Sequence, residues 1–147
     1  MTQSLDLAAI GLALKDTFDL TLKHPITGDD LTVKNKAGEQ EPVSITLYGT
    51  ASKQYRNALQ AMQQRALRRN ARKEKPSVEV MTEESITLLT ACSAGAKNLS
   101  VDGADVGVGE PEAIAASFKK LYADPRFSWV KDQVDEALGD RGNFLSA

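Results

Sequence analysis

The sequence of 147 residues is poor in the side chains that most often carry chemistry. Its one cysteine, Cys92, excludes an internal disulfide and a zinc site built on several cysteines. Its one histidine, His24, excludes a metal site or catalytic pair that needs two histidines. Only 5% of the residues are aromatic, so the core is expected to be mainly aliphatic. No apolar run approaches the roughly 20 residues of a membrane span, and we expect no membrane association.

The N-terminal sequence lacks the basic residues that precede the apolar stretch of a secretory signal peptide. Asp6 stands just before that stretch, and no small-residue cleavage site follows it. We therefore expect a protein of the reducing cytoplasm. Hydrophobic residues make up 41% of the chain and charged residues 26%, values typical of a soluble globular protein. The length predicts a single domain over residues 1–147.

The net charge of −2 conceals a strong segregation along the chain. Residues 1–49 carry 4 basic and 7 acidic side chains, whereas residues 50–76 carry 8 basic side chains and one acid. Residues 77–147 carry 6 basic and 12 acidic side chains. A basic segment between two acidic ones indicates either an internal electrostatic match or a surface for an acidic partner.

Residues 1–49 are expected to form an N-terminal helix followed by a β-meander. A helix from Leu5 to about Lys15 would place Leu7, Ile10 and Leu14 on one face. Apolar residues then alternate with polar ones in three short segments, near residues 18–22, 31–33 and 43–47. The short connections between these segments favour antiparallel pairing.

Residues 50–75 are expected to form one long basic helix, running to about Lys73. Tyr55, Leu59 and Met62 recur at helical spacing and give its first half an apolar stripe. Its second half is almost entirely charged.

Residues 76–147 are expected to be mainly helical. Thr82, Glu110-Pro111 and Asp124-Pro125 each have the character of a helix start. The first of these helices is expected to carry an apolar stripe that extends to Ala96. The glycine-rich segment 103–109 is expected to be a loop. The predicted fold class is therefore α+β, with a small antiparallel sheet of about three strands followed by a mainly α-helical part.

Other candidate chemistry is weak. The glycine-rich segment lacks the Gly-Lys-Ser/Thr ending of a phosphate-binding loop. His24 precedes a turn proline, and Cys92 falls on the apolar stripe of a predicted helix. The acidic clusters are explained by their positions at helix starts or on solvated faces. We expect no enzyme activity, no catalytic residue, no cofactor and no metal site. The acidic clusters are Asp29-Asp30, Glu83-Glu84 and Asp132-Asp135-Glu136.

Four arginines share a broad face of the basic helix, namely Arg65, Arg68, Arg69 and Arg72. They fit a solvated face, a protein-docking surface or a phosphate-binding surface. The acidic overall charge and the absence of aromatic residues among the arginines argue against nucleic acid as the partner.

Several short motifs occur in an order and at spacings that resemble the tail assembly chaperones of long-tailed bacteriophages, over about residues 18–145. They are His24-Pro25-Ile26-Thr27-Gly28; Tyr55-Arg56; Thr82-Glu83-Glu84 before Leu88-Leu89-Thr90-Ala91; Leu121-Tyr122 before Asp124-Pro125; and Asp140-Arg141-Gly142-Asn143-Phe144-Leu145.

The resemblance implies an assembly factor that is not an enzyme. Such chaperones coat the long helical tape-measure protein, keep it soluble and help to deliver subunits of the tail tube. The implied partners are the tape-measure protein and the tail-tube protein, and homo-oligomers are a further expectation. The implied location is the host cell cytoplasm, with no place in the mature virion.

Binding an apolar helix requires an exposed apolar stripe or groove. The candidate partner-binding residues are Leu7, Ile10, Leu14, Tyr55, Leu59, Met62, Arg65, Arg68, Arg69 and Arg72. Two alternative functions remain open at this point. One is a structural tail or head–tail connector protein of the virion, and the other is a small nucleic-acid-binding regulator that uses the basic helix.

Overall fold

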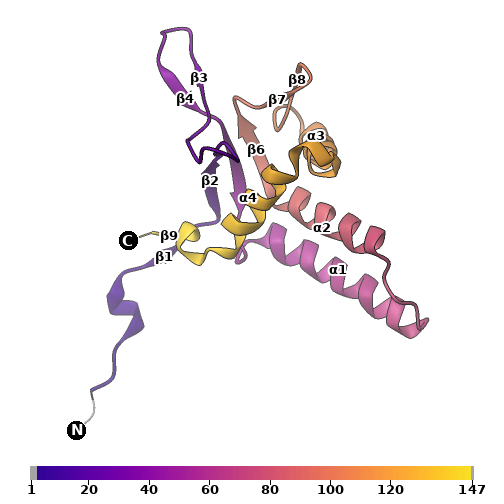
Figure 1. Cartoon of the computed structure of the whole chain (residues 1–147). Coiled ribbons are helices and arrows are strands. Elements are labelled where there is room, and N and C mark those ends of the chain that lie inside the picture. Colours follow the sequence, from indigo (N-terminus) through magenta and orange to yellow (C-terminus); the bar gives the residue numbers. More distant parts are fainter. Residues whose placement is uncertain (1–2, 147) are drawn as a thin grey trace.

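A computed structural model of the chain describes residues 3–146. Its centre is an antiparallel sheet in which β5 (Ser44–Tyr48) lies between β2 (Thr17–Thr21) and β6 (Ser93–Lys97) (Figure 1). β2 and β6 are therefore the outer strands of this sheet.

The two faces of the sheet follow from the alternation of apolar and polar residues. Ile45 and Leu47 are fully buried, and Leu20 packs against the same core. On the opposite face, the Thr46 hydroxyl donates a 2.6 Å hydrogen bond to the exposed Asp19 carboxylate across the β2–β5 pair. One side of the sheet therefore faces the core and the other faces solvent.

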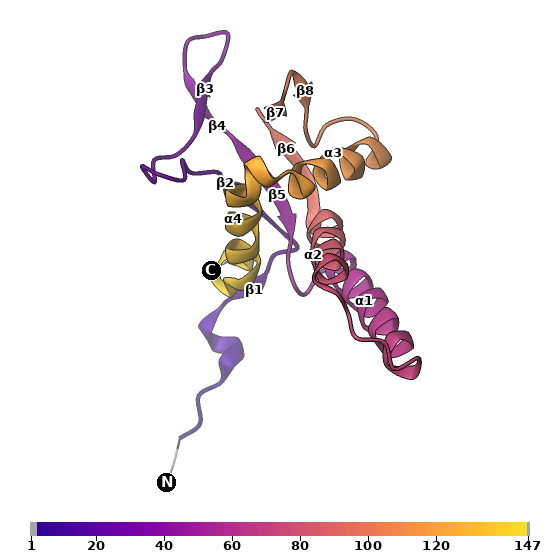
Figure 2. The same cartoon turned by 45° about the vertical axis from the view of Figure 1, so that its right-hand side comes forward.

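Two helices follow β5 and form a hairpin that projects from the body (Figure 2). They are α1 (Lys53–Ala71) and α2 (Val78–Cys92). Ser52 and Ser77 cap them, because each hydroxyl accepts a hydrogen bond from a backbone N–H in the first turn. No residue of α1 is fully buried, since the helix packs mainly on α2.

The C-terminal part contains α3 (Pro111–Ala123) and α4 (Ser128–Gly139), with the 3₁₀ turns η2 (Pro125–Phe127) and η3 (Arg141–Phe144). Together with α2 they cover the apolar face of the sheet. Among residues 3–146, the buried hydrophobic core consists of Leu22, Val43, Ile45, Leu47, Ile86, Leu89, Cys92, Ala96, Val106, Phe118, Leu121, Tyr122, Val130, Val134, Ala137, Leu138 and Phe144.

Two small hairpins extend from the sheet at its upper end in Figure 1. β3 (Thr32–Lys34) pairs with β4 (Gln40–Pro42), and β7 (Ser100–Val101) pairs with β8 (Ala104–Asp105). At the opposite end, β1 (Ala13–Leu14) pairs with β9 (Leu145–Ser146), which fixes the segment before β2 to the C-terminal end of the described chain.

The predicted α+β class is confirmed, with antiparallel strands in the N-terminal half and helices in the C-terminal half. The alternation near residues 18–22 and 43–47 marks β2 and β5. The start of a helix at Pro111 is also confirmed.

The prediction of a helix from Leu5 to Lys15 is wrong. A single 3₁₀ turn, η1 (Leu7–Ile10), is present, and Gly11 ends it with a φ of +77°. Isolated helices shorter than about 12 residues are marginal in water, and here no other element covers the apolar face. Residues 13 and 14 pair with β9 instead.

The helical stripe predicted to extend to Ala96 ends at Cys92, and Ala96 lies in β6. β6, rather than the segment at residues 31–33, completes the central sheet; that segment forms β3, which pairs with β4. The sequence of β6, Ser-Ala-Gly-Ala-Lys, is poor in residues that favour strands. Pairing with β5 therefore decides its conformation.

The second helix begins at Val78 and not at Thr82. Ser77 supplies the N-terminal cap through a 3.2 Å hydrogen bond from Val80 N–H to its hydroxyl. Thr82 lies inside the helix, where its hydroxyl donates to the Val78 carbonyl at 2.9 Å.

Candidate functional site: the apolar arm and the basic helix

Residues 3–12 form an arm that extends away from the body of the protein (Figure 1). The aliphatic side chains of Leu7 and Ile10, both predicted to bind a partner, are 73% and 51% exposed. Leu5 and Leu12 share this arm and are 73% and 55% exposed, and Leu14, where the arm meets β1, is 70% exposed. Isolated exposed leucines are ordinary, but a concentration of exposed aliphatic side chains along one short segment is typical of an interaction site.

The base of the arm is fixed to the body. β1 pairs with β9, and the Lys15 N–H donates a 2.7 Å hydrogen bond to the Phe144 carbonyl. Farther out, the Asp6 carboxylate accepts a hydrogen bond from Ala8 N–H at 3.0 Å and caps η1. The arm therefore has a defined origin and exposed apolar side chains along its length.

The second predicted apolar set, Tyr55, Leu59 and Met62, is half-buried. These residues lie on α1, which packs along α2, and Tyr55 also contacts the main core. Packing within the chain therefore accounts for much of this stripe. Leu67, on the same helix, is 67% exposed and stands apart from the stripe.

The four predicted arginines divide into two pairs. Arg69 donates to both oxygens of the Glu84 carboxylate on α2, and Arg65 approaches the same carboxylate with an Nε–Oε1 distance of 3.7 Å. The hydrogen bond from Arg69 lowers the pKa of Glu84 against the opposing effect of burial. This pair supplies part of the internal electrostatic match that the charge pattern indicates.

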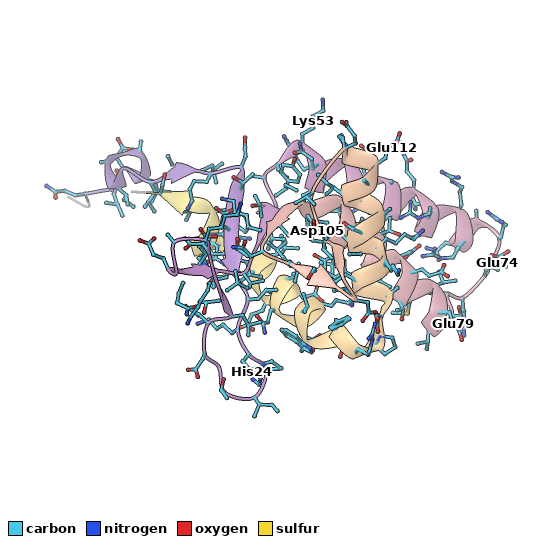
Figure 3. All side chains as sticks on the ribbon, turned by 90° about the horizontal axis from the view of Figure 1, so that it is seen from above. His24, Lys53, Glu74, Glu79, Asp105 and Glu112 are labelled. Atoms are coloured by element: carbon cyan, nitrogen blue, oxygen red, sulfur yellow. The ribbon has the colours of Figure 1, made fainter. Side chains whose placement is uncertain are left out.

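Arg68 and Arg72 are exposed. Arg72 makes one weak ion pair with Glu74 at 3.9 Å, and within residues 3–146 Arg68 makes none. The exposed basic surface of α1 begins at Lys53 beside the body, as Figure 3 shows, and Glu74 and Glu79 lie at the far end of the hairpin. The cations available to a partner are therefore fewer than the sequence suggests.

The glycine-rich segment packs against the sheet. The Gly107 carbonyl accepts a 3.1 Å hydrogen bond from Ala96 N–H, and the Gly107 N–H donates to the Ser117 hydroxyl at 3.0 Å. The N–H and C=O groups of Gly107 are thus both hydrogen-bonded within the protein. A side chain at this position would collide with Ala96, which explains the need for glycine.

His24 has a local structural role. Its Nδ1 accepts hydrogen bonds from the backbone N–H groups of Ile26 and Thr27, at 3.2 and 3.3 Å. These bonds stabilise the turn that follows β2. Cys92 is fully buried, and burial raises the pKa of its thiol to about 12.

The predicted carboxylate clusters are dispersed into separate contacts. Asp30 pairs with Lys23 at 3.7 Å, Glu84 binds Arg69, and Asp135 lies 3.9 Å from Lys131. Burial raises the pKa of Asp135. Residues 3–146 contain no group of three or more histidine, cysteine or acidic side chains placed to hold a metal ion. No helix among them is long and apolar enough to cross a membrane.

The closing motif, residues 140–145, has a structural role. The Asp140 carboxylate accepts from Gly142 N–H at 3.0 Å and caps η3, and the Asn143 amide donates to the Ala137 carbonyl at 3.1 Å. These contacts place the Phe144 ring in the core, edge-on to a second phenylalanine.

The structure adds a groove that the sequence patterns did not indicate. It has a volume of about 500 Å³ and lies between β2 and α4. Gln133 of α4 closes one end, since its side-chain amide accepts from Lys23 N–H at 2.9 Å and donates to the Lys23 carbonyl at 2.8 Å. A contact between residues 110 positions apart leaves no local signal in the sequence.

No protein-family model, no curated protein and no solved structure matches this chain.

Proposed function

We propose that this protein is a tail assembly chaperone of a long-tailed bacteriophage, which acts in the host cell cytoplasm. It binds the tape-measure protein, keeps it soluble and assists assembly of the tail tube. The resemblance of the sequence motifs supports the choice of this family. The observation that carries the proposal is the apolar arm, because a chaperone for apolar helices needs an accessible apolar surface.

The arm suits a reversible interaction. Leu7 and Ile10 are separated by the helical spacing of three, and Leu5 and Leu12 extend the apolar surface to either side. The arm is narrow and is attached only at its base, so its contact area with a client helix is small. Small interfaces are typical of transient complexes. A tail-tube subunit that binds the tape measure over a larger area would displace the chaperone.

Co-expression tests this proposal directly. The tape-measure protein encoded in the same phage genome should be more soluble with the full chain than alone. The double variant Leu7→Asp and Ile10→Asp should lose this effect, because it puts charge on the contact surface without removing any core residue. Leu67→Asp is the matched control, since it places the same charge at an exposed leucine on α1, and it should behave as wild type.

Two results would contradict the proposal. The first is unchanged solubility of the tape-measure protein across several of its fragments. The second is recovery of the chain at stoichiometric amounts from purified virions, which would identify it as a tail or connector component.

A further inference from the structure

β2 has an unpaired edge. In an antiparallel pair, alternate residues point their N–H and C=O groups toward the partner strand. The Leu22 N–H donates to the Val43 carbonyl, and the Asp16 carbonyl accepts from Gly49 N–H, so the even-numbered residues face β5. The main-chain groups of Asp19 and Thr21 therefore point outward, away from the sheet.

Within residues 3–146 no strand occupies this outer side of β2 between its two ends. The edge is closed at one end by the hydrogen bond from Lys15 to Phe144 and at the other by the paired bonds between Lys23 and Gln133. The open interval spans about five residues. An open edge of this kind is a template for a strand from another chain.

The groove of about 500 Å³ runs beside this open edge. Phe18 and Leu20 of β2 supply apolar side chains to its wall, and Ala137 of α4 supplies the opposite wall. Polar side chains, among them Glu136 and Asp140, also line it. The edge thus offers main-chain hydrogen bonds on one side and apolar side-chain contacts on the other, which are the two requirements for adding a strand.

The arm has the chemistry that this groove would accept. Leu5 and Leu7 flank Asp6, and Ile10 and Leu12 flank Gly11, so each pair would place two aliphatic side chains on one face once η1 opens and the arm becomes extended on docking. Pairing of β1 with β9 directs the arm away from the body (Figures 1 and 2). With Lys15 held by Phe144, only Asp16 separates this anchor from β2, which leaves no room for the arm to reverse onto its own strand.

We propose that the arm of one copy docks along the open edge of β2 in a second copy, in the groove between β2 and α4. The exposed aliphatic side chains amount to several hundred Å² of apolar surface in each arm. Reciprocal exchange between two copies covers two arms and two grooves, which approaches the roughly 1,200–2,000 Å² of a stable interface. The inference does not depend on the proposed chaperone function.

The oligomeric state of the full chain tests this inference. Light scattering after size-exclusion chromatography should show a dimer or larger species whose population rises with concentration. The variant Leu7→Asp with Ile10→Asp should weaken association at least about tenfold, because charged side chains would have to enter the groove. Leu67→Asp should associate as wild type.

A second variant tests the groove rather than the arm. Thr21→Pro removes one outward N–H that β5 does not use, and proline is tolerated on an edge strand. The variant should keep the wild-type circular dichroism spectrum and lose association. Since it leaves the arm intact, it should still solubilise a tape-measure client, which separates failure of this inference from failure of the proposed function.

Cross-linking identifies the contact. Leu5→Cys and Leu12→Cys are prepared separately with one tag, and Glu136→Cys is prepared with another. After mixing and oxidation, at least one arm variant should form a disulfide-linked heterodimer with Glu136→Cys and not with Glu79→Cys at the hairpin tip. The buried Cys92 stays outside this reaction. A monomeric wild type at 100 μM, association that survives the arm variant, or no heterodimer from either arm cysteine would overturn the proposal.

Discussion

Arg69 on α1 binds the carboxylate of Glu84 on α2 through both terminal guanidinium nitrogens, the longer contact being 3.3 Å between Nη2 and Oε2. Both side chains are mostly shielded from solvent, and Arg65 lies beside the same carboxylate. This contact joins the basic half of α1 to α2 two residues before Ile86, the first core residue of α2. The hairpin therefore depends on a charge pair as well as on its half-buried apolar stripe.

The Glu84 contact predicts a pH-dependent contribution to stability. Arg69 lowers the pKa of Glu84 in the folded protein, so the stabilisation is fully present above the ordinary carboxyl pKa of about 4.3. It is lost as pH falls through that value toward the lower folded pKa. Glu84→Gln should therefore lower the unfolding temperature at pH 7, and its difference from wild type should shrink below about pH 4.

The control for this measurement is Glu83→Gln. Glu83 is exposed and forms no ion pair within residues 3–146, so its replacement should change the unfolding temperature little at either pH. Arg126 also lowers the pKa values of Asp102 and Asp124, so every variant loses stability in acid. Only the difference between Glu84→Gln and wild type isolates Glu84. An equal difference at pH 7 and pH 3 would show that charge plays no part.

Tyr122 is predicted to stabilise the junction between α2 and β6 through its hydroxyl. The Ser93 hydroxyl donates its one proton to the Leu89 carbonyl at 2.7 Å, so it accepts from the Tyr122 hydroxyl at 2.6 Å. Tyr122→Phe leaves this buried acceptor without its donor and should cost about 1–2 kcal/mol in the free energy of unfolding, measured with urea. Tyr48→Phe, at a half-buried tyrosine, should stay within about 0.5 kcal/mol.

Gly107 and Gly103 provide a matched pair for testing the glycine-rich segment. Both have positive φ, +76° and +82°, so alanine is strained at either position. A Cβ at Gly103 would meet open space, whereas at Gly107 it would collide with the backbone and side chain of Ala96. Gly103→Ala should cost about 1 kcal/mol from backbone strain alone. Gly107→Ala should cost about 3 kcal/mol or more, because overpacking adds to the strain. Equal costs in urea denaturation would contradict the close packing of this segment on β6.

The thiol of Cys92 is predicted to be unreactive in the folded protein. It is fully buried, and desolvation raises the pKa of its thiol to about 12, so almost no thiolate exists near neutral pH. Ellman's reagent should react with native protein at least about 100-fold more slowly than with urea-unfolded protein. As pH rises above the unfolded thiol pKa of about 8.5, folding stability should begin to fall through this group, and Cys92→Ala should not show that component. Rapid labelling of the native protein at pH 7 would exclude the buried position.

Local patterns in the sequence were sufficient where one element decides its own conformation. Strands β2 and β5 show clear alternation, and the proline at the start of α3 marks a helix end. β6 could not be recognised, because its small residues form a strand only through pairing with β5. The Arg69–Glu84 contact could be anticipated only as an excess of basic charge beside acidic segments. The groove at Gln133 depends on a contact between residues 110 positions apart. Neither the periodicity of apolar residues nor secondary-structure propensity contains information about such a contact.

The four arginines of α1 have different predicted roles: one pair stabilises the fold internally, and the other pair is available for binding. Arg65→Gln with Arg69→Gln removes the cations that hold Glu84, whereas Arg68→Gln with Arg72→Gln removes exposed cations. Glutamine and arginine have similar helix propensity, so neither change disturbs α1 itself. Replacing Arg65 and Arg69 (the inner variant) should lower the unfolding temperature. Replacing Arg68 and Arg72 (the outer variant) should leave it nearly unchanged, because exposed charges contribute little to stability.

Binding measurements on the same two variants complete the test. If the exposed arginines contact an acidic surface of the tape-measure protein, the outer variant should capture less of it. The deficit should shrink toward 1 M salt, where the screening length is about 3 Å. Neither variant nor wild type should retard DNA or RNA at physiological salt, since the chain is acidic overall and no aromatic side chain stands among the arginines. Tight, salt-sensitive nucleic-acid binding by wild type that the outer variant abolishes would instead favour a regulator that reads phosphate through α1.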